Sequence, residues 1–128
     1  MSQSNARKVI YLAGGFKSGW QAKVIKQLPG FEFLDPSQHN IQDVAEYTRW
    51  DLDAVRASDF LLGYMESTNP GGYSLALEIG FAHALGKTVL LVDEIKDPIV
   101  SRYFEMVRQC SGRVFTTMAQ AVDYLRGA

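Results

Sequence analysis

Short apolar runs alternate with longer segments of helical periodicity along the chain. The apolar runs are rich in β-branched and aromatic residues, which is typical of strands, whereas the longer segments repeat apolar positions about every three or four residues, which is typical of amphipathic helices. The predicted strands cover residues 8–13, 31–34, 59–65, 88–92 and 113–116. The predicted helices lie near residues 18–28, 42–57, 72–86, 98–109 and 118–126.

This strand and helix order predicts an α/β fold. The strands are apolar on both faces, as in parallel sheets that helices cover on each side. Right-handed crossovers then favour a doubly wound sheet of five parallel strands in the order 2-1-3-4-5. No linker or repeat interrupts the pattern, so we expect one domain over residues 1–128, with residues 1–7 flexible. In such sheets ligands bind beyond the carboxyl ends of the strands where the winding reverses, here between the first and third strands.

Composition narrows the class of partner. The 128 residues carry 13 basic and 14 acidic side chains without a basic run, which argues against a nucleic-acid polymer and favours a small-molecule ligand. No apolar stretch approaches the roughly 20 residues of a membrane span, and the N-terminus lacks the apolar core of a signal peptide, so we expect a cytoplasmic protein without a membrane partner. The single cysteine, Cys110, excludes an internal disulfide and has no nucleophile or zinc-site spacing.

Glu78 is the most informative residue because it interrupts an apolar helix. It lies in the run 73–85, directly after the glycine turn 69–72. Burying a lone ionised carboxylate costs roughly several kcal/mol in lost hydration. Such a residue therefore needs either a hydrogen-bonding partner or a role in a reaction. The loop before this helix follows the third strand, so Glu78 is expected near the crevice as a candidate catalyst.

A second acid, Asp51, is expected on the apolar face of its helix. At about 100° per residue, Val44, Tyr47, Asp51 and Val55 share one stripe. The alternative is that Asp51 only pairs with a loop amide or an arginine. The Asp51-x-Asp53 spacing does not indicate a metal, because oxygen-ligand sites usually need further convergent acids.

Tyr11 and the loop after the first strand complete the candidate site. Tyr11 precedes the strand end and can either orient a carboxylate or simply fill the core. The loop 14–19 matches neither the dinucleotide fingerprint nor a Walker loop, so NAD and ATP are not expected, and no cofactor is implied. The loop is either an ordinary tight turn or a cradle for a sugar or phosphate, with Phe16 placed to stack on a base.

Two acids and a hydroxyl around a small pocket suit glycosyl chemistry, in which one carboxylate attacks an anomeric carbon and another manages the proton of the leaving group. The stretches 10–16, 47–59 and 77–87 resemble the nucleoside 2-deoxyribosyltransferase family, most specifically in Glu78-Ile-Gly-x-Ala-x-Ala-x-Gly-Lys87 and in the spacing from Asp51 to Asp59. The resemblance implies a flavodoxin-like fold, base exchange on 2′-deoxyribonucleosides without a cofactor, and a homo-oligomer whose neighbouring subunits help to close each site.

Carried over by position, the resemblance makes Glu78 the nucleophile, Asp51 the acid that meets the base, and Tyr11 the tyrosine that orients the nucleophile. Two displacements would give net retention, and the pKa values of the two acids are expected to be pushed apart. Many transferases of the family carry an Asp six residues before the nucleophile to bind the sugar, whereas this chain has Gly72. The sugar contact is therefore expected to differ.

The first loop also resembles a related branch, the nucleoside 5′-monophosphate N-glycosidases, in which water replaces the acceptor base. That resemblance assigns phosphate binding to the glycine loop and to a few further residues. The candidate substrate-binding residues are Gly14, Gly15, Phe16, Lys17, Gly72 and Ser74. A third alternative is a nucleotide-binding module without turnover, although a binder of anions gains nothing from two buried carboxylates. We expect the neighbouring subunit to meet helix 98–109, with Ser101, Arg102 or Met106 completing the partner's pocket.

Overall fold

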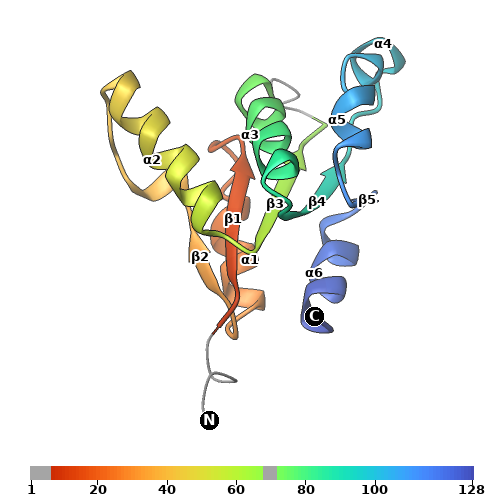
Figure 1. The fold of residues 1–128 in the computed structure, drawn as a ribbon. Coiled ribbons are helices and arrows are strands. Elements are labelled where there is room, and N and C mark those ends of the chain that lie inside the picture. The colour runs from red at the N-terminus through yellow and green to blue at the C-terminus, as the bar shows by residue number, and fades with distance from the viewer. Residues whose placement is uncertain (1–6, 68–71) are drawn as a thin grey trace.

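The computed structural model describes residues 7–67 and 72–128 and contains one five-stranded sheet (Figure 1). The strands are all parallel and follow the order β2-β1-β3-β4-β5, which confirms the predicted doubly wound α/β fold. Their bounds are β1 (Val9–Gly14), β2 (Glu32–Leu34), β3 (Phe60–Met65), β4 (Thr88–Asp93) and β5 (Arg113–Phe115). The expected flexibility of residues 1–6 and the turn at 69–71 lie outside the described residues.

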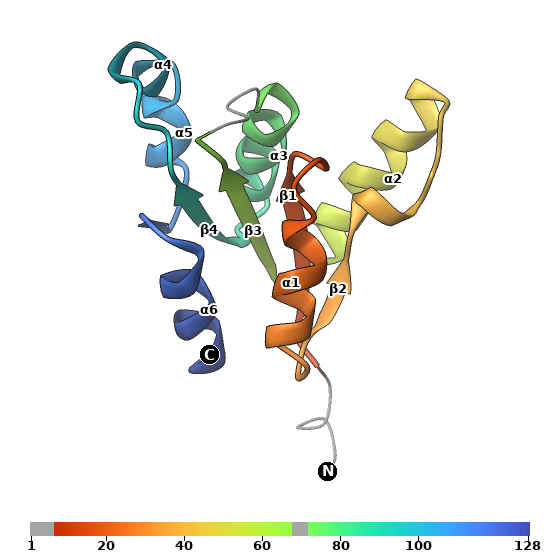
Figure 2. The same ribbon diagram turned by 180° about the vertical axis from the view of Figure 1, so that it is seen from behind.

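Helices cover both faces of the sheet (Figures 1 and 2). Those packed on one face are α1 (Trp20–Gln27) and α6 (Met118–Arg126); those on the other are α2 (Val44–Ala57), α3 (Tyr73–Ala84), α4 (Pro98–Arg102) and α5 (Glu105–Gln109). A 3-10 turn, η2 (Pro36–Gln38), follows β2. No helix within residues 7–67 and 72–128 is long and apolar enough to span a membrane.

Alternation along β1 decides which side chains reach the α2 and α3 face. Ile10 and Leu12 belong to the core cluster under α1 and α6, whereas Tyr11 and Ala13 belong to the cluster under α2 and α3. This follows from the period of two along a strand. Tyr11 therefore lies on the same side of the sheet as the helix that carries Glu78.

The helices begin in two different ways. Asp43 caps α2 by accepting a hydrogen bond from the Glu46 amide at 3.0 Å, and Thr117 forms a capping box at the start of α6. In contrast, α1 and α3 begin at Gly19 and Gly72, which adopt left-handed φ values of 74° and 67° and provide no side-chain cap. The first amides of α3 are therefore not satisfied by a capping side chain.

The prediction of one helix over residues 98–109 is wrong, because the chain breaks between α4 and α5. Phe104 turns into the core at the break and is only 7% exposed. Arg108 folds back to donate to the Ser101 carbonyl at 2.7 Å and to Asp93 at 2.8 Å. Burial of the aromatic ring and a charge-assisted cap on α4 together outweigh helical continuity.

The predicted apolar stripe on α2 packs against the sheet only at its C-terminal end. Ala54 and Val55 are buried, but Val44 is 64% exposed, and the N-terminal half of the helix extends past the sheet (Figure 1). The middle of the stripe, at Tyr47 and Asp51, faces a pocket instead. Periodicity predicted which side of α2 faces the rest of the protein. It could not predict that the N-terminal half of the helix extends beyond the sheet.

Candidate active site

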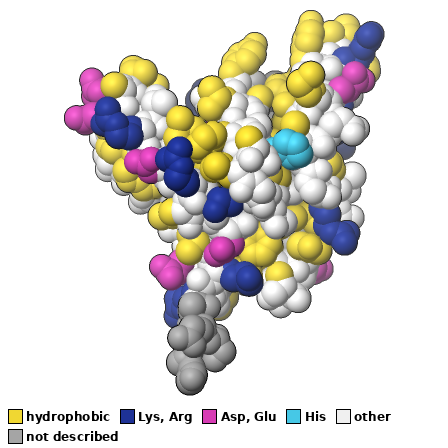
Figure 3. Space-filling view, in the orientation of Figure 1, with side chains coloured by type: hydrophobic (Ala, Val, Ile, Leu, Met, Phe, Trp, Pro, Cys, Tyr) yellow, Lys and Arg dark blue, Asp and Glu magenta, His cyan; other side chains and the backbone are white. Residues whose placement is uncertain are grey.

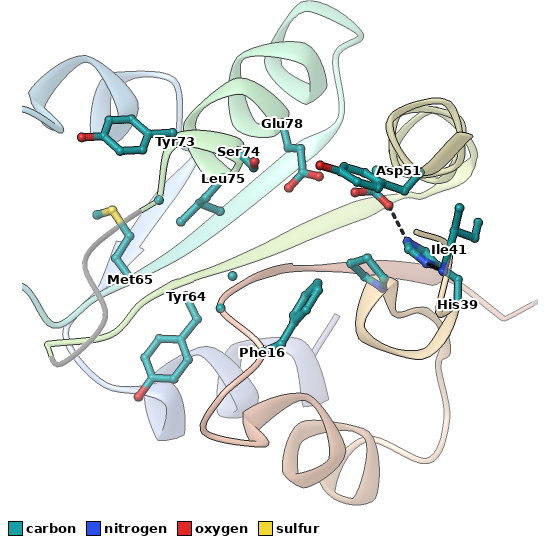
Figure 4. Close-up of a pocket in the computed structure, with 15 residues that line it drawn as sticks. Phe16, His39, Ile41, Asp51, Tyr64, Met65, Tyr73, Ser74, Leu75 and Glu78 are labelled. Atoms are coloured by element: carbon teal, nitrogen blue, oxygen red, sulfur yellow. Dashed lines mark hydrogen bonds and ion pairs between the residues drawn. The ribbon is translucent and has the colours of Figure 1, made fainter. Parts of the chain in front are cut away.

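A pocket of about 520 Å³ opens at the carboxyl ends of β1 and β3, where the winding of the sheet reverses (Figure 4). Its volume falls within the range of about 300–1,000 Å³ that is typical of small-molecule sites. The lining residues are Gly14, Gly15, Phe16, Pro36, His39, Ile41, Tyr47, Asp51, Tyr64, Met65, Gly72, Tyr73, Ser74, Leu75 and Glu78. Most of the predicted site residues are therefore brought together here.

Glu78 reaches the pocket from the second turn of α3 and is held by Tyr11. The Tyr11 hydroxyl donates to Oε2 of Glu78 at 2.6 Å, and both side chains are buried. Burial raises the pKa of Glu78 to about 7, the hydrogen bond from Tyr11 opposes this rise, and the charge of Asp51 adds to it. Burial, and then the charge of Glu78, raise the pKa of Tyr11 well above its usual range, so its hydroxyl remains a donor.

Asp51 faces the same pocket from α2, and its partner is His39. The Nε2 atom of His39 lies 3.1 Å from Oδ1 of Asp51, with both side chains less than one-fifth exposed (Figure 4). Burial raises the pKa of Asp51, while the hydrogen bond with His39 acts in the opposite direction. Asp51 thus pairs with a histidine, whereas the sequence suggested a loop amide or an arginine as its alternative partner.

The sequence led us to expect that the pKa values of the two acids are pushed apart, and this stays a prediction, because the pocket raises the pKa of both acids. Burial is the largest cause for both acids, and it raises the pKa of each. Because the charge of Asp51 also raises the pKa of Glu78, the two carboxyls titrate as an interacting pair. Such a pair favours a state that holds a single proton, with one acid ionised and the other neutral.

The loop after β1 is shaped for close approach to the pocket. Gly14 has a φ of 155°, and a Cβ at this position would lie 2.9 Å from the Tyr64 carbonyl oxygen and 3.0 Å from the Trp20 ring. The Gly15 carbonyl accepts hydrogen bonds from the Trp20 indole and the Gln21 amide, both at 2.9 Å. The loop backbone is therefore fixed by side chains of α1 rather than left as a simple turn.

The candidate substrate-binding residues do not all reach the pocket. Phe16 lines it and is 56% exposed, so its ring is available for stacking. Gly72 and Ser74 line it at the start of α3, where amides without a capping side chain and a hydroxyl face the cavity. Lys17 is exposed and lies outside the lining.

The sequence did not single out His39 or Ile41 as site residues, although both line the pocket. The turn η2 directly precedes His39 and Ile41, and Asp35 caps that turn by accepting from the Ser37 amide at 3.0 Å. The motif Asp35-Pro-Ser37 was the available signal, since an Asp before a Pro at the first helical position starts a short turn.

The fold and the paired acids define the class: a doubly wound α/β protein with a small-molecule pocket at its winding reversal, where a tyrosine holds one carboxylate and a histidine holds another. The sequence profile described as "Nucleoside 2-deoxyribosyltransferase like" matches residues 7–95. The chain therefore belongs to the nucleoside 2-deoxyribosyltransferase-like family and is an enzyme that acts on N-glycosidic bonds.

Solved structures share this fold. A 2-deoxyribosyltransferase from Leishmania mexicana aligns with a TM-score of 0.74 and 23% identity, covering 92% of this chain and 96% of that one. A CMP N-glycosidase from Clostridium botulinum aligns with a TM-score of 0.58 and 19% identity, covering 94% and 100%. No curated protein matches the chain by sequence. Both alignments extend over nearly the whole chain, as expected for a common flavodoxin-like architecture.

Proposed function

We propose that this enzyme transfers 2′-deoxyribose between nucleobases through a covalent deoxyribosyl intermediate on Glu78. The observation that carries the proposal is the buried hydrogen bond from Tyr11 to Oε2 of Glu78. This bond favours the ionised carboxylate and fixes its plane, and it leaves Oε1 to attack. Burial favours the neutral form of Glu78 because it raises the pKa. A glutamate with only a structural role would therefore need no donor that favours its ionised form.

In the first half-reaction, Oε1 of Glu78 forms a bond to C1′ as the bond from C1′ to the base breaks. The electron pair of that bond passes to the base, and protonated Asp51 supplies the proton that neutralises it. The active state thus has Glu78 ionised and Asp51 protonated, which is one of the two single-proton states of the pair. In the second half-reaction an incoming base attacks C1′, its proton returns to Asp51, and Glu78 leaves. Two inversions give net retention.

The binding roles follow from position in the pocket. Phe16 and Tyr47 offer aromatic surfaces beside Asp51, where the base would lie. Gly14 and Gly15 allow the substrate to approach the backbone, and Ser74 offers a hydroxyl near the sugar. At Gly72, where many transferases of the family carry an Asp, the αL backbone takes the place of a carboxylate contact.

A second candidate function is hydrolysis of nucleoside 5′-monophosphates. The observation that favours it is the start of α3, where Gly72 caps the helix without a side chain and Ser74 faces the pocket, which is a suitable site for a phosphate. The observation against it is charge: among residues 7–67 and 72–128, no lysine or arginine lines the pocket. We therefore favour an uncharged nucleoside donor and base exchange.

Chromatography of reaction products tests the choice. The purified protein is incubated with deoxyinosine or thymidine, with and without adenine, and in parallel with the matching 5′-monophosphates. Base exchange predicts deoxyadenosine only when adenine is present. Release of free base chiefly from the monophosphates, whether or not adenine is present, would replace the transferase assignment with the N-glycosidase.

We further propose that a neighbouring copy covers the open side of the pocket. Tyr73 on α3 lines the pocket, and further exposed apolar side chains on the same side of the sheet are Leu77 on α3, Tyr103 after α4 and Met106 on α5, each of the four more than 60% exposed. Hydrophobic side chains gather over α3 and α4 in the space-filling view (Figure 3). Apolar surface of this kind marks interfaces between proteins, and it includes Met106, expected to reach a partner's site.

A further inference from the structure

His39 touches the acid of the pocket but has no role in the mechanism above. Its ring is held from three directions: Nε2 lies 3.1 Å from Oδ1 of Asp51, Nδ1 accepts from the Ile41 amide at 3.0 Å, and the ring meets Trp50 edge to face with centroids 4.7 Å apart. Asn40 makes this clamp possible, because its φ of 54° turns the Ile41 amide back toward the ring. A merely packed histidine needs no such clamp.

The clamp determines where the hydrogen of the neutral imidazole lies. A backbone N–H can only donate, so Nδ1 must be the acceptor atom of the ring. The neutral ring then carries its hydrogen on Nε2 and donates it to Oδ1 of Asp51. Oδ1 is therefore the acceptor oxygen of the carboxyl group in both protonation states of Asp51.

We propose that His39 is a positioning residue that holds the acidic proton of Asp51 on Oδ2 and supports the carboxylate that remains when the proton leaves. Oδ2 accepts no hydrogen bond from any described residue, and Asp51 lines the pocket, so this oxygen is available to the base. The proton moves from Oδ2 to the departing base while the His39 hydrogen stays on Nε2. This inference rests on the proposed function and adds His39 as a residue that positions its general acid, Asp51.

The groups around Asp51 explain why a neutral hydrogen-bond donor, the His39 ring, can assist this acid. Glu78 on α3 and Asp35 at the end of β2 are acidic, and Tyr11 on β1 is a neutral hydroxyl. Burial raises the pKa of Asp51, and the interaction between Asp51 and Glu78 disfavours two negative charges in the pocket. The hydrogen bond from His39 opposes this rise, so it makes Asp51 a stronger acid.

Two donors separate proton delivery from the rest of catalysis. Deoxyinosine needs a proton on its departing base, whereas the base of 7-methyl-2′-deoxyguanosine is cationic and leaves without one. For His39→Ala we expect kcat/KM to fall by about 10- to 100-fold with deoxyinosine, as for a weakened general acid, and to stay within about threefold with the methylated donor. His39→Gln, whose amide can donate to Oδ1, should retain more of the deoxyinosine activity.

The pH profile gives a second readout. Because His39 lowers the pKa of Asp51, its removal should move the basic limb of kcat/KM for deoxyinosine to higher pH while lowering the plateau. His83→Ala, which removes an exposed histidine of α3, is the matched control and should change neither readout. If His39→Ala does not fold, judged by circular dichroism, His39→Phe, whose ring fills the same space but cannot donate to Oδ1, carries the same comparison.

The outcomes distinguish this inference from the function on which it rests. Equal losses on both donors, with an unmoved basic limb, would assign His39 a packing role and overturn the inference. Asp51→Asn serves as the reference, since it should abolish deoxyinosine turnover and spare the methylated donor. If Asp51→Asn leaves deoxyinosine turnover intact, the acid role itself is wrong. If the native protein releases base from neither donor, the proposed function fails and the inference fails with it.

Discussion

At the level of single residues, the protonated form of Glu78 stabilises the fold, whereas the proposed attack needs the ionised form. Its pKa of about 7 lies above the ordinary 4.5, so the folded state holds this proton more tightly than the unfolded chain does. The stability associated with the protonated side chain is complete below about pH 4.5 and is lost as the pH rises through 7. At about 1.36 kcal/mol per pKa unit, the loss is on the order of 3 kcal/mol.

Glu78→Gln should therefore stabilise the protein as it inactivates it. We expect the free energy of unfolding at pH 8 to rise by about 1–3 kcal/mol, and the gain to vanish near pH 4, because glutamine resembles the protonated acid. Turnover should fall by at least about 10³-fold, as for loss of a nucleophile. Urea unfolding at both pH values checks the first part, with the exposed Glu32→Gln as control. A destabilised variant at pH 8 would contradict the stated balance of burial and charge.

Tyr11→Phe tests the partner of the nucleophile. The hydrogen bond from Tyr11 lowers the pKa of Glu78, so its removal raises that pKa and moves the acidic limb of kcat/KM to higher pH. A bond to a charged group is worth about 1.5–3 kcal/mol, so activity at pH 6 should fall by about 10- to 100-fold and at pH 8 by less. A uniform loss with an unmoved limb would mean that Tyr11 acts only by packing.

At the level of elements, the distance between β3 and α3 sets the position of Glu78, the proposed nucleophile. Gly63 of β3 lies under the first turns of α3, and an added Cβ would lie 3.0 Å from Leu75 Cδ1 and 3.4 Å from Leu91 Cδ1. Leu75 also lines the pocket. The helix can approach the sheet closely because position 63 has no side chain.

Gly63→Ala should push the start of α3 outward. We expect a loss of about 1–2 kcal/mol in stability, as in other overpacked cores, together with lower kcat/KM. Gly80→Ala is the matched control on α3: an added Cβ there meets nothing within 4 Å, so the change should stabilise the helix by about 0.5–1 kcal/mol and leave activity unchanged. Thermal unfolding and initial rates measure both. Equal behaviour of the two variants would remove the claim that helix spacing positions Glu78.

The sequence predicted the elements well where a single periodicity continues. The sheet order and helix α6 follow from apolar runs and capping residues, and Glu78 is conspicuous as an acid in an apolar helix. The break in segment 98–109 depends on a contact of Arg108 with Asp93, which lies 15 residues earlier. The position of His39 depends on the turn η2, which brings this residue to Asp51 of α2. Periodicity carries no information about either contact.

At the level of the whole molecule, the proposed assembly uses surface that a lone chain exposes. Leu77 lies on the outer side of α3, one residue before Glu78, and is 61% exposed. We expect sedimentation to show an oligomer, and Leu77→Asp to dissociate it and to lower activity, because the pocket then stays open to water. Val114→Asp, on β5, is the control and should leave the assembly intact. A fully active monomer would refute the proposed role of the neighbouring copy.

Mass spectrometry of a trapped intermediate tests the proposed covalent step at Glu78. A 2′-fluorinated deoxynucleoside slows both half-reactions by destabilising the oxocarbenium-like transition state, and the slow second step lets the intermediate accumulate. The account predicts an intact mass increased by one fluorinated deoxyribosyl group, mapped by peptide sequencing to Glu78, absent in Glu78→Gln, and lost when adenine is added. Base release from the same donor without any adduct, or an adduct on another residue, would contradict it.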